Sequence, residues 1–154
     1  MTAPTLTGPS AGAPRMPVSA HLLPHRTPVE LLALARRGLL EASASSSAPQ
    51  RYATAHLAAL RAAAAVLAMR AQPVAGRRRS RVTSAWLLLV KVAPELAEWA
   101  EFFAAGAAKR SAAEAGIAKV TAREADDLVR AAEQFVDVVQ VTLGLSAHQP
   151  SFAG

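Results

Sequence analysis

Residues 51–70 read RYATAHLAALRAAAAVLAMR, and this stretch decides the fold of the chain. It contains neither Gly nor Pro and is dominated by Ala and Leu, which are strong helix formers. Helical spacing places an apolar seam along one side and a seam of smaller residues with polar ends beside it. The apolar seam comprises Ala53, Leu57, Leu60, Ala64 and Leu67; the small-residue seam comprises Tyr52, His56, Ala59, Ala63, Val66 and Arg70. Because both seams need helical neighbours, we expect this helix at the centre of a bundle.

Helix signals before this stretch predict one further helix. Thr27-Pro28-Val29-Glu30 combines a Thr cap, a Pro at the first helical position and a Glu that closes a capping box. This helix is expected to end at about Glu41, with Leu31 and Leu39 facing inward. A serine-rich link follows, and Pro49 then opens the central helix.

Two more helices are predicted after the central one. The first runs from about Ala85, and Pro94 kinks or restarts it because Pro lacks an N–H and clashes with the preceding turn. It is expected to end at about Glu114. A second capping box, Thr121-Ala-Arg-Glu124, begins the last helix, which Gly144 ends.

The sequence therefore predicts one all-α domain, an up-and-down bundle of four to five helices over residues 27–144. Residues 1–26 contain five prolines and no periodic pattern, so we expect a disordered arm. Residues 145–154 are predicted to form a short flexible tail. No segment shows the alternation typical of a strand.

Composition narrows the functional classes. No apolar run reaches the roughly 18 residues that span a bilayer, and the N-terminus lacks the pattern of a signal peptide. With no cysteine there is neither a disulfide nor a thiolate metal site. The sequence contains no phosphate-binding or metalloprotease motif. We therefore predict a cytoplasmic protein with no membrane contact, no metal site and no cofactor.

The charge is divided unevenly along the chain. Up to Arg81 there are 11 basic and 2 acidic residues, a balance of +9, whereas the remainder holds 6 basic and 9 acidic residues, a balance of −3. The densest cluster is Arg77-Arg78-Arg79-Ser80-Arg81. We predict that this cluster and Arg61 and Arg70 of the central helix face an anion such as RNA or a nucleotide. The alternative is that the acidic half neutralises the basic half within the bundle or across a dimer.

Three stretches resemble known proteins: residues 51–68, the segment WLLLVKVAPELAEWAEFF at 86–103, and TAREADDL at 121–128. Together they look like HEPN domains (higher eukaryotes and prokaryotes nucleotide-binding), most closely a small actinobacterial branch of stand-alone proteins. The resemblance covers roughly residues 27–144. It implies an all-α bundle that is often dimeric. Many members are metal-independent RNases or toxins with an Arg-x(4–6)-His motif, and others are inactive binding modules or partners of nucleotidyltransferases.

Arg51-Tyr-Ala-Thr-Ala-His56 fits the spacing of that motif. The resemblance implies that His56 would act as acid and base while Arg51 steadies a phosphate. Residues five apart on a helix differ by about 140°, so the two share a face only if Arg51 turns back from the first turn. The other interpretation of His56 is a partly buried histidine packed by Tyr52.

Three functional hypotheses follow. The first is an RNA- or nucleotide-associated HEPN-like binding module with weak or no catalysis. The second is a metal-independent RNase that uses Arg51 and His56. The third is a helical partner module, for example a homodimer through the small-residue seam or a nucleotidyltransferase partner.

Overall fold

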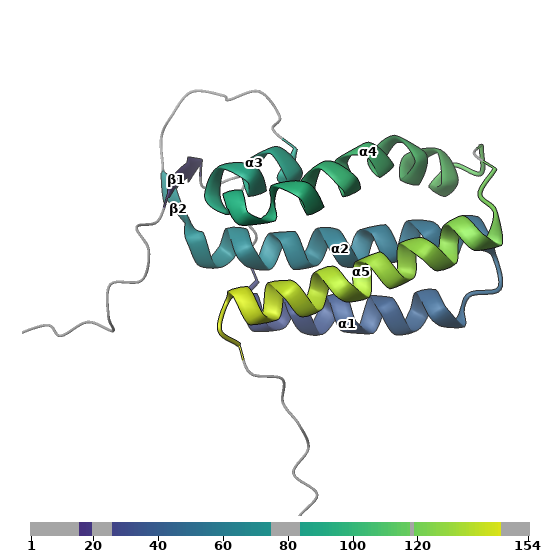
Figure 1. Cartoon of the computed structure of the whole chain (residues 1–154), viewed down its shortest axis with the longest axis horizontal. Helices are drawn as coiled ribbons and strands as arrows, with labels where there is room; N and C mark the ends of the chain where they lie inside the picture. The colour runs from purple at the N-terminus through teal and green to yellow at the C-terminus, as the bar shows by residue number, and fades with distance from the viewer. Residues whose placement is uncertain (1–15, 20–25, 75–83, 118, 146–154) are drawn as a thin grey trace, which may run out of the picture.

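The computed structural model describes residues 16–19, 26–74, 84–117 and 119–145. Among these residues it contains five α-helices and two short strands (Figure 1). The helices are α1 (Pro28–Ala44), α2 (Ala48–Arg70), α3 (Ala85–Val92), α4 (Ala97–Glu114) and α5 (Ala122–Thr142). The 3₁₀ turn η2 (Pro94–Leu96) joins α3 to α4, and the strands are β1 (Met16–Ser19) and β2 (Ala71–Val74). The predicted all-α bundle is confirmed.

Side-chain caps begin α1 and α5 at the predicted residues. The Thr27 hydroxyl accepts a hydrogen bond from the Glu30 backbone N–H at 3.1 Å. The Thr121 hydroxyl likewise accepts from the Glu124 N–H at 3.1 Å. Each bond satisfies an N–H that has no partner inside the helix, so the cap specifies where the helix begins.

The ends of the helices also follow local chemistry. Gly116 follows α4 with a φ of 73°, and Gly144 follows α5 with a φ of 67°, a region that favours Gly. Helix α1 continues to Ala44 and so ends later than the predicted Glu41. The added turn contains two alanines, which extend a helix readily.

The predicted interruption at Pro94 is confirmed. Helix α3 ends at Val92, and Ala93 leaves the helical region with φ −144° and ψ 72°. The ring of a following proline disfavours helical backbone at the residue before it. The chain restarts through η2, with Pro94 at its first position, and continues as α4.

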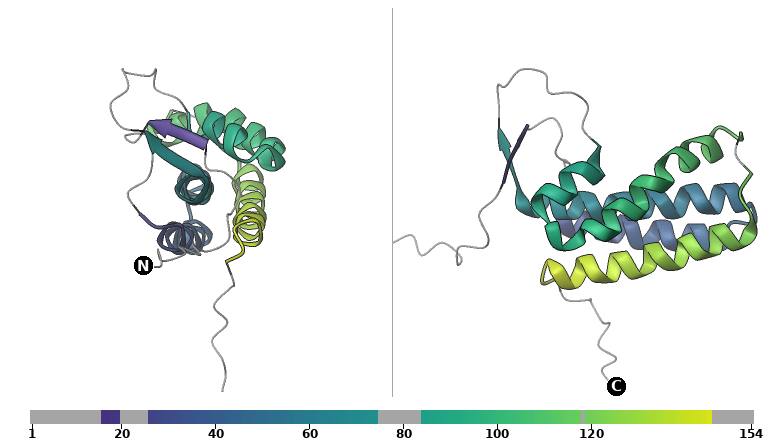
Figure 2. Two further views of the ribbon diagram at one scale, coloured as in Figure 1. Left: turned by 90° about the vertical axis from the view of Figure 1, so that its left-hand side faces the viewer. Right: turned by 45° about the horizontal axis from the view of Figure 1, so that its top comes forward.

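Helix α2 lies at the centre of the bundle and contacts α1, α3, α4 and α5. The end-on view in Figure 2 shows α1, α5 and the α3–α4 pair around three sides of α2. Its most deeply buried residues are small: Ala55, Ala58, Ala59, Ala62, Ala63, Ala65 and Val66 are each 0% exposed. A helix with so little side-chain bulk lets its neighbours approach closely.

The predicted apolar seam of α2 is only partly correct. Ala53 and Leu67 are buried, but Leu57, Leu60 and Ala64 are half-buried. Leu57 and Ala64 belong to a half-buried stripe of α2, and Ala64 still packs against the core. The small-residue seam is the better-buried one, because α3 and α4 pack onto it. The sequence pattern identified the two seams but not which one the neighbours would cover.

A cluster of aromatic rings fills the core between α3, α4 and α5. Phe103 of α4 and Phe135 of α5 are 0% exposed, with ring centroids 5.2 Å apart. Trp86 of α3 stacks on Phe103 at 5.2 Å, and Trp99 lies 5.6 Å from Phe135. These rings supply the large side chains that α2 lacks.

The parallel pairing of β1 with β2 corrects the prediction that no strand forms. Met16 pairs with Ala71 and Ser19 pairs with Val74. Met16–Ser19 lies within the segment predicted to be a disordered arm; the rest of residues 1–25 and the tail from 146 lie outside the described residues. Each strand contains a proline, which a two-stranded ladder tolerates because every strand is an edge. The two partners are far apart in the chain, so no local pattern indicated the pairing.

Helix α2 is long and apolar enough to cross a membrane by composition. However, 61% of that window is buried inside the bundle, as in the core helix of a folded domain.

Candidate functional site

Arg51 lies in the first turn of α2, where its guanidinium binds other parts of the chain. Its Nε and Nη2 donate to the Ser45 carbonyl at 3.2 and 3.0 Å. Its Nη1 pairs with Asp126 Oδ1 of α5 at 2.8 Å, and the Arg51 side chain is 17% exposed. These bonds tie the end of α1 and the start of α2 to α5.

His56 lies on a different side of α2 from Arg51 and is 1% exposed. Its Nε2 lies 2.8 Å from the Phe103 carbonyl oxygen. Because a carbonyl can only accept, Nε2 must carry the hydrogen, and Nδ1 of the neutral ring is then an acceptor. The rings of Trp86 and Phe103 meet the imidazole edge-on at 5.9 and 6.0 Å.

Burial is the main cause that lowers the pKa of His56. The Phe103 carbonyl raises that pKa, the positive charge of Arg110 lowers it, and Glu114 raises it. The net direction is downward, so the imidazole is neutral at neutral pH.

The structure does not bring Arg51 and His56 into one site. Arg51 binds Asp126 on α5, whereas His56 binds the backbone of α4 and touches α3. The angular offset expected from their spacing is therefore retained. The alternative interpretation, a histidine packed inside the fold, agrees with this geometry, and the burial is more complete than the sequence suggested.

The polar groups around His56 come mostly from α4, and they were not predicted from the sequence. A Cβ on Gly106 would lie 2.9 Å from the Tyr52 hydroxyl and 3.5 Å from His56 Cδ2, so Gly106 leaves room for both side chains. Lys109 pairs with Glu124 and holds its ammonium 5.8 Å from the centre of the Tyr52 ring. The burial of Tyr52 raises the pKa of its hydroxyl. A glycine inside a helix was the available signal, because it often marks a close contact.

Arg110 continues the same side of α4. Its Nη1 pairs with Glu114 Oε1, one turn later, at 2.9 Å. The Arg110 Nε is buried and has no hydrogen-bond partner among the described residues. This pair adjoins a cleft, to which Glu114 contributes.

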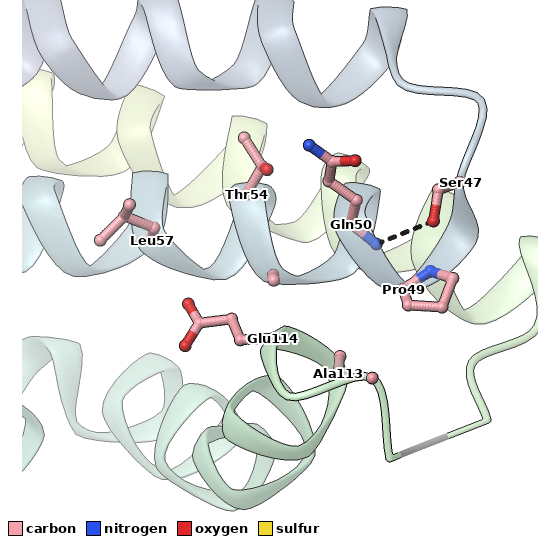
Figure 3. Close-up of a pocket in the computed structure, with 9 residues that line it drawn as sticks. Ser47, Pro49, Gln50, Thr54, Leu57, Ala113 and Glu114 are labelled. Carbon is pink, nitrogen blue, oxygen red and sulfur yellow. Dashed lines mark hydrogen bonds between the residues drawn. The ribbon is translucent and has the colours of Figure 1, made fainter.

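The cleft has a volume of about 510 Å³ and lies where the start of α2 meets the end of α4 (Figure 3). Its lining combines amide, hydroxyl, carboxylate and apolar groups. Figure 3 shows the Glu114 carboxylate near Leu57, across from Thr54 and Gln50. The lining residues are Ser47, Pro49, Gln50, Ala53, Thr54, Leu57, Ala113, Glu114 and Gly116.

The predicted anion-binding arginines do not form one surface in the described residues. Arg61 is half-buried beside α1, where its Nη1 lies 3.7 Å from the position of a Cβ on Gly38. Arg70 pairs with Glu95 and donates to the Val92 carbonyl, toward α3 and η2. Nine residues on a helix correspond to about 180°, so Arg61 and Arg70 point to opposite sides. Arg77, Arg78, Arg79 and Arg81 lie outside the described residues.

Within the described residues there is no group of three or more His, Asp or Glu side chains that could hold a metal ion. Glu98 and Glu101, one turn apart on α4, are exposed.

Comparison with known families now defines the class: the all-α bundle is a HEPN domain. The chain belongs to the family described as SAV_6107-like HEPN, whose profile matches residues 42–140. That match extends from the last turn of α1 into the last turn of α5 and covers more than half of the chain. No curated protein and no solved structure matches the chain.

Proposed function

We propose that this HEPN domain is an RNA- or nucleotide-associated binding module with weak or no catalysis. Weak or no catalysis is inferred from the environment of His56, which is 1% exposed and hydrogen-bonded to the Phe103 carbonyl. A general acid or base must reach the proton that it transfers, directly or through one water. An imidazole enclosed by aromatic rings does not meet that condition, and Arg51 is engaged by Asp126 on another side.

The anionic ligand is inferred from charge. The balance of +9 up to Arg81 is concentrated in the cluster Arg77-Arg78-Arg79-Ser80-Arg81. Arginine clusters without interleaved aromatic residues favour phosphate contacts over base stacking. We therefore assign RNA backbone contact to this cluster, with Arg61 as an additional contact.

The test is the affinity of the purified protein for a fluorescently labelled single-stranded RNA pool at several salt concentrations. Removing four phosphate contacts with Arg77→Ala/Arg78→Ala/Arg79→Ala/Arg81→Ala should reduce the slope of log affinity against log salt by about 3. The matched control is Lys91→Ala/Lys119→Ala/Arg123→Ala/Arg130→Ala, which removes the same charge from exposed positions on other parts of the chain. Equal slopes for the two quadruple variants would contradict the assignment.

The rival function is a metal-independent RNase, which the Arg51-x(4)-His56 spacing favours. The assay is incubation with the same RNA pool in EDTA, comparing the wild type with His56→Gln. Gln can still donate to the Phe103 carbonyl, so we expect this variant to fold. Circular dichroism compares its helix content with that of the wild type. We expect no cleavage by either protein. Cleavage by the wild type that disappears in a folded His56→Gln would overturn the binding-module proposal.

The proposal also includes a cytoplasmic location and a nucleotidyltransferase as protein partner. Co-purification of the two proteins from cells that express both tests the partner.

A further inference from the structure

The cleft between the start of α2 and the end of α4 has polar groups on two opposite sides (Figure 3). Its α4 side carries Glu114, whose side chain is 47% exposed. Its α2 side carries a polar row that helical steps of three and four place on one line: Ser47, Gln50 and Thr54. Glu114 is the only ionised side chain among the lining residues that the structure describes. The cleft is therefore acidic on one side and polar without charge on the other.

An apolar strip of α2 separates the two polar sides of the cleft. Pro49, Ala53 and Leu57 form this strip at steps of four residues. His56, which bonds to α4, lies about 60° from Ala53 around the helix, and Thr54 lies about 100° from Ala53 in the other direction. The strip thus runs between α4 and the polar row. Its side chains form no hydrogen bonds, so it suits a hydrocarbon stem.

The acidic side of the cleft favours a cation. Glu114 Oε1 accepts from Arg110 Nη1 at 2.9 Å, whereas Glu114 Oε2 has no hydrogen-bond partner among the described residues. Glu114 also lies in the last turn of α4, which contains no basic residue. The carbonyl end of a helix carries a partial negative charge, which adds to the attraction of the carboxylate for a cation.

The α2 side of the cleft offers little to an anion, although it includes the start of a helix. The Ser47 hydroxyl already accepts from the Gln50 N–H at 3.4 Å, and Pro49 has no N–H. The Arg51 N–H bonds to the Ser47 carbonyl at 2.8 Å. These backbone donors are therefore absent or satisfied, whereas the side-chain oxygens of Gln50 and Thr54 can accept hydrogen bonds.

We propose that this cleft binds a linear aliphatic diamine. One ammonium bonds to the Glu114 carboxylate, and the hydrocarbon stem lies over Ala53 and Leu57. The second ammonium donates to the side-chain oxygens of Gln50 and Thr54. An aliphatic ammonium resembles the lysine side chain and is charged at neutral pH. The volume of about 510 Å³ lies within the range of small-molecule sites. The site contains none of the arginines assigned to RNA, so it does not depend on the proposed function.

The test is a titration of ¹⁵N-labelled protein with 1,4-diaminobutane, followed through the chemical shifts of the backbone amides. We expect the largest shifts at the lining residues, with a dissociation constant of about 1 mM for a ligand of this size. Butylamine lacks the second ammonium and should bind about threefold more weakly or worse. The uncharged 1,4-butanediol should bind at least about tenfold more weakly than the diamine.

Two variants locate the binding in the cleft. Glu114→Gln keeps the shape of the side chain but removes its charge, and should raise the dissociation constant about tenfold or more. Thr54→Val removes the hydroxyl at the far side and should raise the dissociation constant about threefold. The matched control is Glu101→Gln, which removes the same charge from an exposed position elsewhere on α4 and should change nothing. The amide spectrum of each variant shows whether the fold is retained.

Several results would overturn the proposal. One is binding of the diamine to Glu114→Gln, or of 1,4-butanediol to the wild type, that is as tight as diamine binding to the wild type. Another is equal weakening by Glu101→Gln, because general attraction to acidic side chains then explains the binding. Tighter binding of Nα-acetyl-lysine amide than of 1,4-diaminobutane would assign the cleft to a lysine side chain of another protein instead. The absence of shifts at the lining residues in millimolar diamine would exclude the site.

Discussion

Two glycines face α2 from different sides, and they leave room for different neighbours. A Cβ on Gly38 of α1 would lie 3.4 Å from the Ala58 Cβ, an ordinary packing distance. A Cβ on Gly106 of α4 would lie 2.9 Å from the Tyr52 hydroxyl, closer than real Cβ contacts. The α1 contact thus joins small apolar groups, whereas the α4 contact accommodates polar rings.

The chemistry of the two contacts differs accordingly. On the α1 side, Ala58 lies in a stripe with Ala55 and Ala62, all 0% exposed and all without polar side chains. On the α4 side, α2 contributes Tyr52 and His56. Close packing alone determines the strength of the first contact. The second also depends on protonation and on one hydrogen bond, so the two contacts should respond differently to mutation and pH.

The largest expected effect is at the α4 contact. Phe103→Ala removes a fully buried ring that touches His56, Trp86 and Phe135, and should lower the free energy of unfolding by about 3–5 kcal/mol. Urea denaturation measures this loss. The neighbouring Phe102 is half-exposed, so Phe102→Ala should cost about 1 kcal/mol or less. Similar losses for the two variants would contradict the assignment of Phe103 to the core.

The α1 contact should be sensitive to added volume. Ala58→Leu inserts three carbon atoms opposite Gly38 and should destabilise the protein by about 1–3 kcal/mol. Ala64→Leu makes the same change on the half-buried side of α2 and should be nearly neutral. Urea denaturation of the two variants checks the difference. A larger loss of stability from Ala64→Leu than from Ala58→Leu would contradict the inference that α1 packs closely on α2 at Ala58.

The pH dependence of stability should arise at the α4 contact. Because the folded-state pKa of His56 is lowered, the unfolded chain binds more protons when pH falls below about 6.5. The contribution of His56 is therefore fully present above that pH and is lost as pH falls toward the folded-state pKa, with a slope of at most about 1.4 kcal/mol per pH unit. Urea denaturation at several pH values should show a smaller loss for His56→Gln. An unchanged slope in that variant would contradict the prediction.

The smallest effects are expected from replacing each of the two glycines with alanine. Gly38→Ala should stabilise the protein by about 0.5–1 kcal/mol, because Ala loses less conformational entropy than Gly in a helix and the added methyl group fits beside Ala58. Gly106→Ala should not stabilise the protein, because the added methyl group clashes with the Tyr52 hydroxyl. Adding Tyr52→Phe to the same chain removes the clash and should restore the stabilisation. Thermal unfolding of the three variants measures the effect. A gain from Gly106→Ala alone would show that Tyr52 moves aside freely.

Helix boundaries were the most predictable part of the fold. The caps at Thr27 and Thr121 and the interruption at Pro94 depend on groups within a few residues of one another, so the sequence was sufficient. The pairing of β1 with β2 was not predictable, because its partners are distant in the chain.

The candidate site was less predictable than the fold. The spacing of Arg51 and His56 indicated that they point to different sides of a helix, and they do. The sequence did not indicate the neighbours of His56. Gly106 and Arg110 lie on successive turns of a separate helix, and no residue near position 56 specifies that this helix packs there. The anion-binding role of Arg61 and of the Arg77–Arg81 cluster stays a prediction.

The sequence by itself determined the all-α class, most helix ends and the central place of α2, because propensity, capping and periodicity act locally. Only the tertiary structure decided which seam of α2 is covered. It also decided that His56 is enclosed while Leu57 remains half-buried. The physical reason is that burial depends on where the other helices pack. In this bundle α4 packs closely against α2 at Gly106, because the missing side chain leaves room for Tyr52 and His56.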